Sequence, residues 1–139
     1  MNRKRYVLDS YALLSLLFGE AASVEVKSIL HESEKAKNEV FMHWNNVAEV
    51  YYIIRRQGSQ KKALEAISLV KALPIKFIEF DEVLWLKAAE LKGTYPISFC
   101  DAFVAAMADL LDATIITGDP EFKKLQDKFP IHWLAEKKK

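Results

Sequence analysis

Four acidic residues stand in apolar surroundings, where a carboxylate is unfavourable unless another group compensates its charge. They are Asp9, Glu49, Asp101 and Asp119. Asp9 directly follows the apolar residues 6–8, and Asp119 comes two positions after the β-branched run of residues 114–117. If the four carboxylates meet in one site, they cannot all stay ionised unless a cation neutralises them. The set therefore predicts a bound metal ion.

The types of candidate ligand indicate which metal this is. Carboxylates without clustered histidine or cysteine favour Mg²⁺ or Mn²⁺ over zinc. His31, His43 and His132 are scattered without ligand spacing, so we expect them at the surface or satisfied in the core. A divalent ion held by a few carboxylates is a common site of phosphoryl-oxygen chemistry, in which the substrate phosphate completes the coordination shell.

Each of these acids also has a simpler interpretation as part of a helix cap. The candidate caps are Asn46-x-x-Glu49, Ser98-x-x-Asp101, Asp119-Pro120, and Asp9 or Ser10. What favours a metal site is their joint placement. All four acids fall at predicted helix N-termini, and Asp9 and Asp119 follow strands that we expect to lie side by side in a sheet.

Strands and helices alternate along the chain and must position these acids. We expect strands over residues 5–8, 40–43, 75–80, 113–117 and 131–134, and helices over 11–18, 21–33, 46–57, 59–72, 81–92, 98–111 and 120–128. Gly19, Gly58, Pro74 and Gly93 are the expected helix ends. The pattern predicts a three-layer α/β/α sandwich around a mainly parallel sheet. Such sheets bind ligands at the carboxyl ends of their strands, near the topological switch point.

Composition fits one globular domain over residues 1–139, with 51% apolar and 28% charged residues. The single cysteine, Cys100, excludes an internal disulfide and favours a reducing cytoplasm. It has no nearby histidine partner, so we expect a small buried side chain rather than a nucleophile. We see no secretory signal and no membrane span of roughly 18 apolar residues. The expectation is a soluble, cytoplasmic protein.

The net charge of +1 means that any polyanion must be held by local basic patches. Arg55, Arg56, Lys61 and Lys62 cluster around Gly58, and Arg3-Lys4-Arg5 forms a second patch. Both could contact phosphates, or simply be solvated.

Tyr51 and Tyr52 could stack on bases, although aromatic residues at helical spacing more often belong to a core or interface. Lys137-Lys138-Lys139 is expected to be a solvated tail. The acids expected at the solvated surface are Glu25, Glu32, Glu34, Glu65, Glu90 and Asp127.

Four blocks of the sequence resemble the PIN-domain nucleases, particularly the VapC-type toxin ribonucleases of toxin–antitoxin pairs. The blocks are Tyr6-Val7-Leu8-Asp9-Ser10, Asn45-Asn46-Val47-Ala48-Glu49-Val50, Ile97-Ser98-Phe99-Cys100-Asp101-Ala102 with Ala105-Ala106, and Ile115-Ile116-Thr117-Gly118-Asp119-Pro120-Glu121-Phe122. Their order and spacing match the family over essentially the whole domain.

The resemblance implies a PIN-like fold in which the four acids are catalytic and bind Mg²⁺ or Mn²⁺, supported by Ser10 and Thr117. It implies RNA cleavage by metal-activated water, a homodimer and a small antitoxin that inserts into the active-site groove. Two departures concern the last block. Gly118 stands where many members have a polar residue, and Glu121 adds a fifth acid, so that either Asp119 or Glu121 could contact the metal. Asp119 is favoured because it directly follows the strand.

The early helices and the helix that carries Glu49 hold more apolar residues than one small core needs, so they are candidate interfaces. These residues are Leu13, Leu14, Leu16, Leu17, Phe18, Val50, Tyr51 and Ile54.

Two other functions share features with this sequence. A haloacid-dehalogenase-like phosphotransferase needs a second acid two residues after Asp9, and this position is Tyr11. A catalytically inactive PIN-like module that binds RNA or protein stays open, although all four acids are present.

Overall fold

The computed structural model describes residues 3–135 as a sheet of five strands covered by helices. The strands are β1 (Lys4–Leu8), β2 (Asn38–His43), β3 (Lys76–Ile78), β4 (Thr114–Thr117) and β5 (Ile131–Trp133). The helices are α1 (Ser10–Leu17), α2 (Ser23–Glu34), α3 (Trp44–Gln57), α4 (Gln60–Lys71), α5 (Glu82–Thr94) and α6 (Phe99–Leu111), with a 3₁₀-helix, η1 (Pro120–Leu125). The predicted basic tail, residues 137–139, lies outside the described residues.

All neighbouring strands pair in parallel, in the order β3-β2-β1-β4-β5. The chain starts at the centre with β1 and builds outward through β2 and β3. It then returns to the other side of β1 for β4 and β5. The topological switch point therefore lies between β1 and β4, which pair through Leu8 and Ile116. In open parallel sheets this is where ligands bind, at the carboxyl ends of the strands.

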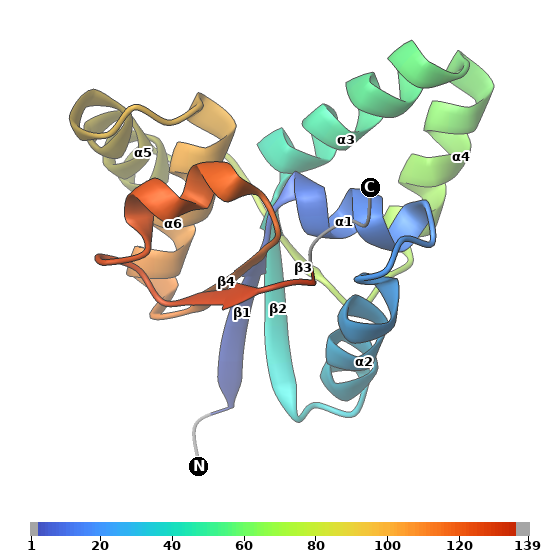
Figure 1. The fold of residues 1–139 in the computed structure, drawn as a ribbon, viewed down its shortest axis with the longest axis horizontal. Helices are drawn as coiled ribbons and strands as arrows, with labels where there is room; N and C mark the ends of the chain where they lie inside the picture. The colour runs from blue at the N-terminus through green and yellow to red at the C-terminus, as the bar shows by residue number, and fades with distance from the viewer. Residues whose placement is uncertain (1–2, 136–139) are drawn as a thin grey trace.

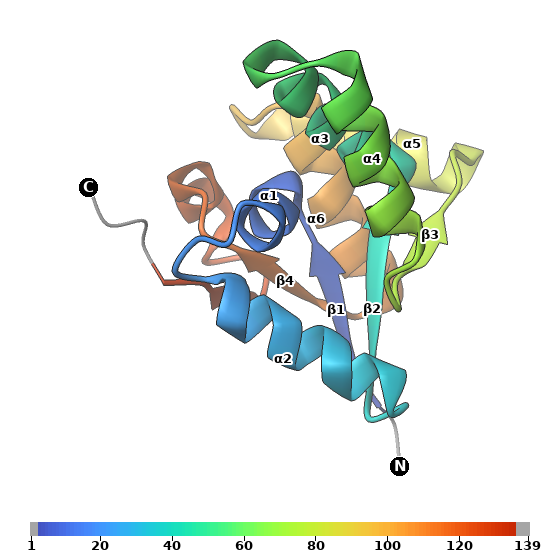
Figure 2. The same cartoon turned by 90° about the vertical axis from the view of Figure 1, so that its right-hand side faces the viewer.

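Alternate residues of β1 face two different helical layers. Tyr6 and Leu8 pack in a core with buried residues of α1 to α4, whereas Val7 packs with buried residues of α5, α6 and η1. Figure 1 shows α5 and α6 on one side of the sheet, and Figure 2 shows α1 to α4 from the opposite side. The predicted three-layer α/β/α sandwich is confirmed, with the sheet entirely parallel.

Several element boundaries differ from the sequence-based expectation, and three of the differences concern α5, η1 and β3. Helix α5 passes through Gly93 to Thr94, because Pro96 favours an extended conformation at Tyr95 (φ −118°, ψ 145°) and so sets the helix end. The expected helix over residues 120–128 is a 3₁₀-helix that ends at Leu125. The expected strand over residues 75–80 is limited to Lys76–Ile78. Gly19 does follow the end of α1 in the left-handed conformation (φ 63°), as predicted.

Part of the apolar surplus on α1 and α3 is absorbed by this chain's own core. Leu13, Val50 and Ile54 are buried there, which corrects their assignment as interface candidates. Leu14, Leu16, Leu17 and Tyr51 are partly buried against the same core. Phe18 alone of the eight candidates has a large exposed side chain, at 48%.

The helices of residues 3–135 differ from single membrane-spanning helices in length or in apolar composition. None of them alone is long and apolar enough to cross a membrane, while α5 and α6, which meet at a bend of 119°, satisfy length and composition only when they are joined.

Candidate active site

Asp9 lies at the carboxyl end of β1, where its side chain caps α1. Its Oδ1 accepts from the backbone N–H of Ala12 at 2.8 Å, so the predicted cap is confirmed for Asp9. Its Oδ2 accepts from the Thr117 hydroxyl. The carboxyl group is almost fully buried, and this burial raises its pKa to about 8, with smaller contributions from the charges of Asp101 and Asp119. The group is therefore both fixed in place and short of positive charge.

Thr117, at the end of β4, connects two of the four acids. Its hydroxyl accepts from the backbone N–H of Asp119 at 3.0 Å and donates to Asp9. Because an amide can only donate, the hydroxyl proton is directed at the Asp9 carboxyl group. The Thr117 side chain is fully buried, so both hydrogen bonds of its hydroxyl are shielded from water.

Asp101 enters from the opposite helical layer, in the first turn of α6. Ser98 caps this helix by accepting from the Asp101 backbone N–H at 3.1 Å, as predicted. Burial raises the pKa of Asp101 to about 6, followed by the nearby charges of Asp119, Glu49 and Glu121. A hydrogen bond between the Ser98 side chain and the Asp101 carboxyl group acts in the opposite direction and lowers the pKa of that group. These mutual influences show that the acids share one region, although they come from four separate segments.

The predicted capping pattern Asn46-x-x-Glu49 is wrong. His43 caps α3 instead, because its Nδ1 accepts from the Asn45 backbone N–H at 2.9 Å, and the helix starts at Trp44. Glu49 therefore lies in the second turn of α3. Its carboxylate is free for other partners and accepts from the Ser10 hydroxyl and, at 3.4 Å, from the Tyr52 hydroxyl. Partial burial and then Glu49 raise the pKa of Tyr52, so that hydroxyl keeps its proton.

Asn46, which the sequence suggested as a helix cap, instead connects two helices. It is fully buried, and its Nδ2 donates to the backbone oxygen of Cys100 at 3.4 Å, joining α3 to α6. Its spacing of three before Glu49 is the signal that could have identified it, because both residues then face the same way on the helix. Cys100 itself is half-buried, and burial followed by Glu49 and Asp101 raises the pKa of its thiol to about 11. A thiol that keeps its proton is a poor nucleophile.

The carboxylates of Asp119 and Glu121 have different surroundings and different partners. Asp119 is half-buried and caps η1, with Oδ1 accepting from the Glu121 backbone N–H at 3.0 Å. The Glu121 carboxylate is exposed and pairs with Lys124 at 2.7 Å. Glu121 thus has a cationic partner of its own, whereas Asp119 adjoins Thr117 and the buried acids.

Tyr11 explains why a glycine follows Thr117. A Cβ atom at Gly118 would lie 3.0 Å from Cζ of Tyr11 and nearer still to Cε1. The tyrosine ring therefore occupies the space that a side chain at position 118 would need. This contact lies between α1 and the β4 end, beside Asp119.

The acidic cluster fits a hard divalent cation in its chemistry. Among residues 3–135, no three His, Cys, Asp or Glu side chains already surround a common point as a metal would require. The raised pKa values of Asp9 and Asp101 mean that these buried carboxyl groups tend to retain their protons. A bound divalent cation would replace those protons, because its charge compensates the ionised carboxylates. Because Asp9 is already held by Ala12 and Thr117, ligation of one ion by three of these carboxylates would require the others to move.

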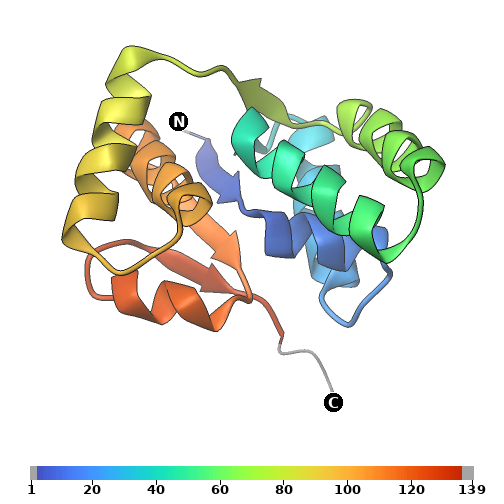
Figure 3. The same cartoon turned by 90° about the horizontal axis from the view of Figure 1, so that it is seen from above.

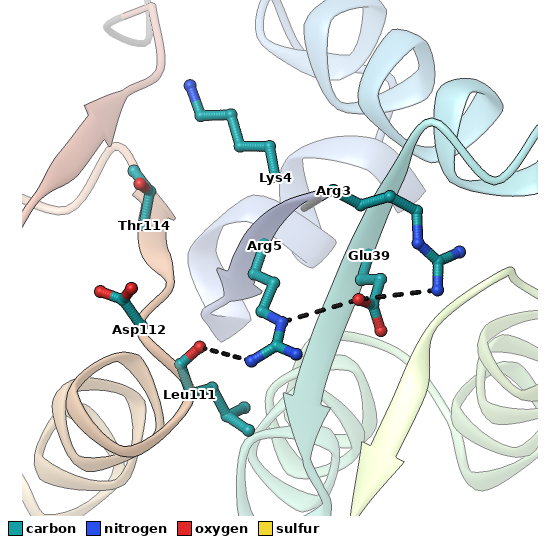
Figure 4. Close-up of a pocket in the computed structure, with 7 residues that line it drawn as sticks. All are labelled: Arg3, Lys4, Arg5, Glu39, Leu111, Asp112 and Thr114. Atoms are coloured by element: carbon teal, nitrogen blue, oxygen red, sulfur yellow. Dashed lines mark hydrogen bonds and ion pairs between the residues drawn. The ribbon is translucent and has the colours of Figure 1, made fainter. Parts of the chain in front are cut away.

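The two basic patches lie at very different distances from the acids. Residues 3–5 begin β1, roughly 16 Å from Asp9 at the strand rise per residue. There they line a polar hollow of about 450 Å³ (Figure 4), in which Arg3 and Arg5 approach Glu39 at 3.7 and 3.6 Å. Arg5 also donates to the backbone oxygen of Leu111, at the end of α6. This patch therefore lies at the opposite end of the sheet from the acidic cluster.

The second patch spans the end of α3, the helix that carries Glu49, and the start of α4. Arg55 and Arg56 end α3, and Lys61 and Lys62 begin α4. Within residues 3–135 none of the four takes part in an ion pair, and all are exposed. Seen from above, α3 runs outward from the centre of the molecule (Figure 3). The patch is thus in reach of a polyanion that crosses the acidic cluster.

Two of the histidines, His43 and His132, lie at contacts between separate elements. His43 is buried and stacks on Phe103 with ring centroids 4.5 Å apart, and burial lowers its pKa. His132 of β5 pairs with Glu25 of α2, so Glu25 is not the purely solvated charge that the sequence suggested. This pair ties α2 to the edge of the sheet.

Comparison with known proteins places this geometry in a family. The PIN domain matches residues 6–128. VapBC2 from Rickettsia felis, solved with a promoter DNA fragment, has a TM-score of 0.72 at 14% identity, covering 94% of this chain and 99% of that one. VapBC-1 from nontypeable Haemophilus influenzae has a TM-score of 0.69 at 20% identity, covering 93% and 97%.

A third similar structure is Mycobacterium tuberculosis VapC20, a toxin that cleaves the sarcin–ricin loop. Its TM-score is 0.69 at 16% identity, covering 89% of this chain and 95% of that one. No match was found among curated proteins. At these identities the likeness to solved structures concerns the fold, whereas the domain match spans most of the sequence. The chain belongs to the PIN domain family.

Proposed function

We propose that this protein is a Mg²⁺- or Mn²⁺-dependent endoribonuclease whose catalytic and metal-binding acids are Asp9, Glu49, Asp101 and Asp119. The observation that carries the proposal is the burial of Asp9 and Asp101 at the switch point of the sheet, where burial and neighbouring carboxylates raise the pKa of both groups. Two acids buried in this way cost stability that a neutral pair would not, and such perturbed carboxyl groups are characteristic of functional sites. Membership of the PIN domain family supports nuclease chemistry.

In this mechanism Asp9 and Asp101 are the principal ligands, and Asp119 and Glu49 complete the acidic cluster. When bound, the metal supplies an activated water and stabilises the leaving oxygen of the phosphodiester. Thr117 holds the Asp9 carboxylate, and Ser10 holds that of Glu49. The free cations at the junction of α3 and α4 would bind backbone phosphates on either side of the cleaved bond.

We further propose that the chain is the toxin of a toxin–antitoxin pair in the cytoplasm, acting as a homodimer. Several similar folds were solved as such pairs, including the Rickettsia felis and Haemophilus influenzae structures. An apolar groove of about 490 Å³ between α1, α2 and α4 offers a surface for an antitoxin. Its apolar lining residues are Leu16, Leu17, Leu30, Leu69, Ala72, Leu73 and Pro74.

The test of the enzyme proposal is cleavage of single-stranded RNA by the purified chain in Mg²⁺ or Mn²⁺, with Asp101→Asn and an excess of chelator as controls. We expect cleavage by the wild type and a loss of at least 100-fold in either control. Equal cleavage in the chelator or by the variant would show that the acidic cluster is not the active site. If no RNA is cut but RNA is still bound, the chain is an inactive PIN-like module.

A further inference from the structure

Tyr52 exposes an aromatic ring at the rim of the acidic cluster. It lies one turn after Glu49 on α3, and its hydroxyl reaches Glu49 Oε2 at 3.4 Å. The side chain is nevertheless 43% exposed. Its neighbour Tyr51 is partly buried against the core, so the two tyrosines that sequence reasoning treated together have different surroundings. Of these two tyrosines, Tyr52 is the one whose ring is exposed beside Glu49.

Arg56 extends this feature along the same helix face. Its guanidinium carbon lies 5.0 Å from the centre of the Tyr52 ring, which is a cation–π contact. Glu49, Tyr52 and Arg56 are spaced by three and four residues, so they form one row over roughly 10 Å of helix. Arg56 is exposed and has no ion-pair partner within residues 3–135. The row therefore presents an acid, an aromatic ring and a free cation, in that order.

We propose that Tyr52 stacks on an unpaired nucleobase next to the cleaved phosphate of the RNA, while Arg56 supports the ring and contacts the following phosphate. This inference rests on the proposed ribonuclease function and adds how its substrate is recognised. A base within a duplex has both faces covered by its neighbours, so a stacking side chain selects single-stranded or splayed-out nucleotides. A protein partner is disfavoured as the occupant, because the ring stands between a carboxylate and a guanidinium at the rim of the cluster.

The experiment measures binding of a labelled single-stranded RNA that the wild type cleaves, with all variants made in the non-cleaving Asp101→Asn protein. Tyr52→Phe keeps the ring, and Tyr52→Leu removes it. We expect Tyr52→Phe to bind within about twofold of the parent. Tyr52→Leu should bind roughly 10- to 100-fold more weakly, which is the usual contribution of one stacked base.

An abasic scan distinguishes stacking from a general structural role. Each nucleotide around the cleavage site is replaced in turn by an abasic one. For the parent protein, one position should weaken binding by the same factor as Tyr52→Leu. For Tyr52→Leu, the abasic substitution at that position should have no further effect. Equal sensitivity of both proteins at every position would overturn the proposal.

Arg56→Gln has a matched control in Arg55→Gln, which removes the same charge from the same helix turn without touching the ring. We expect Arg56→Gln to weaken RNA binding at least threefold more than Arg55→Gln.

If Tyr52→Leu binds RNA as tightly as Tyr52→Phe while the wild type cuts RNA, the stacking proposal fails and the ribonuclease proposal stands. If the wild type neither cuts nor binds RNA, both proposals fail.

Discussion

The Thr117 hydroxyl donates a hydrogen bond to the Asp9 carboxyl group, although the two residues are 108 positions apart in the chain. Thr117 ends β4 and Asp9 follows β1, so the bond closes across the switch point of the sheet. The same hydroxyl accepts from the Asp119 amide, which fixes the direction of its proton. A buried acid is thereby held in one orientation before any cation is bound.

Replacing Thr117 by valine should reduce both metal affinity and stability. Valine has nearly the same shape but no hydroxyl, so buried Asp9 loses one of its two donors. We expect a loss of about 1–3 kcal/mol in unfolding free energy and a roughly 10- to 100-fold weaker affinity for Mn²⁺. Urea denaturation and calorimetric titration measure the two effects. Thr117→Ser restores the donor and should recover most of the affinity; a serine variant no better than valine contradicts this reading.

The raised pKa of Asp9 predicts how metal-free stability depends on pH. The folded group has a pKa of about 8 and the unfolded one about 3.8, so the unfolded chain binds fewer protons between these values. Its contribution to stability is fully present below about pH 4 and is lost as pH rises towards 8. Urea unfolding in chelator between pH 4.5 and 8.5 should show this decline.

Two controls isolate the Asp9 contribution to that decline. Asp9→Asn cannot titrate at this position, so its stability should fall less with pH. Saturating Mn²⁺ should stabilise the wild type more at pH 8 than at pH 5, because protons compete with the metal for the same oxygens. Parallel pH profiles for the wild type and the variant would show that Asp9 ionises freely in the folded chain.

Gly118→Ala should be destabilising, because its new methyl group meets the Tyr11 ring. We expect a loss of about 1–3 kcal/mol, as for overpacking at a close contact. Gly93→Ala is the matched control, since a Cβ there meets nothing within 4 Å and the residue lies inside α5. That variant should gain about 0.5–1 kcal/mol from helix propensity. Thermal unfolding of both variants, together with RNA cleavage by Gly118→Ala, measures the difference; equal stability of the two would contradict it.

Asp119 and Glu121 should differ in their effect on metal binding. Asp119→Asn removes a carboxylate beside Asp9 and Asp101, so Mn²⁺ affinity should fall about 10-fold or more. Glu121→Gln removes an exposed partner of Lys124, a pair worth about 0–1 kcal/mol, and should change the affinity less than threefold. Titration of both variants with Mn²⁺ decides between them, and the reverse ranking would assign the fourth ligand to Glu121.

Local sequence determined the elements of this fold and the identity of its candidate site. An acid directly after an apolar run is a feature of neighbouring residues, and so are the caps by Asp9, Ser98 and Asp119, which the structure confirms. Hydrophobic periodicity likewise indicated parallel strands covered by helices, because the period of burial is a property of each segment alone.

Tertiary structure decided the contacts between those segments. Only the folded chain brings Ser10 into contact with Glu49. It also leaves Tyr52 exposed while Tyr51 is half-buried, and it places residues 3–5 at the opposite end of the sheet from the acids. Helix α3 starts two residues early for a related reason, because the ring of His43 turns back onto the Asn45 amide. A hydrogen bond or a stacked ring depends on which distant residues meet, and sequence spacing along one segment does not contain that information.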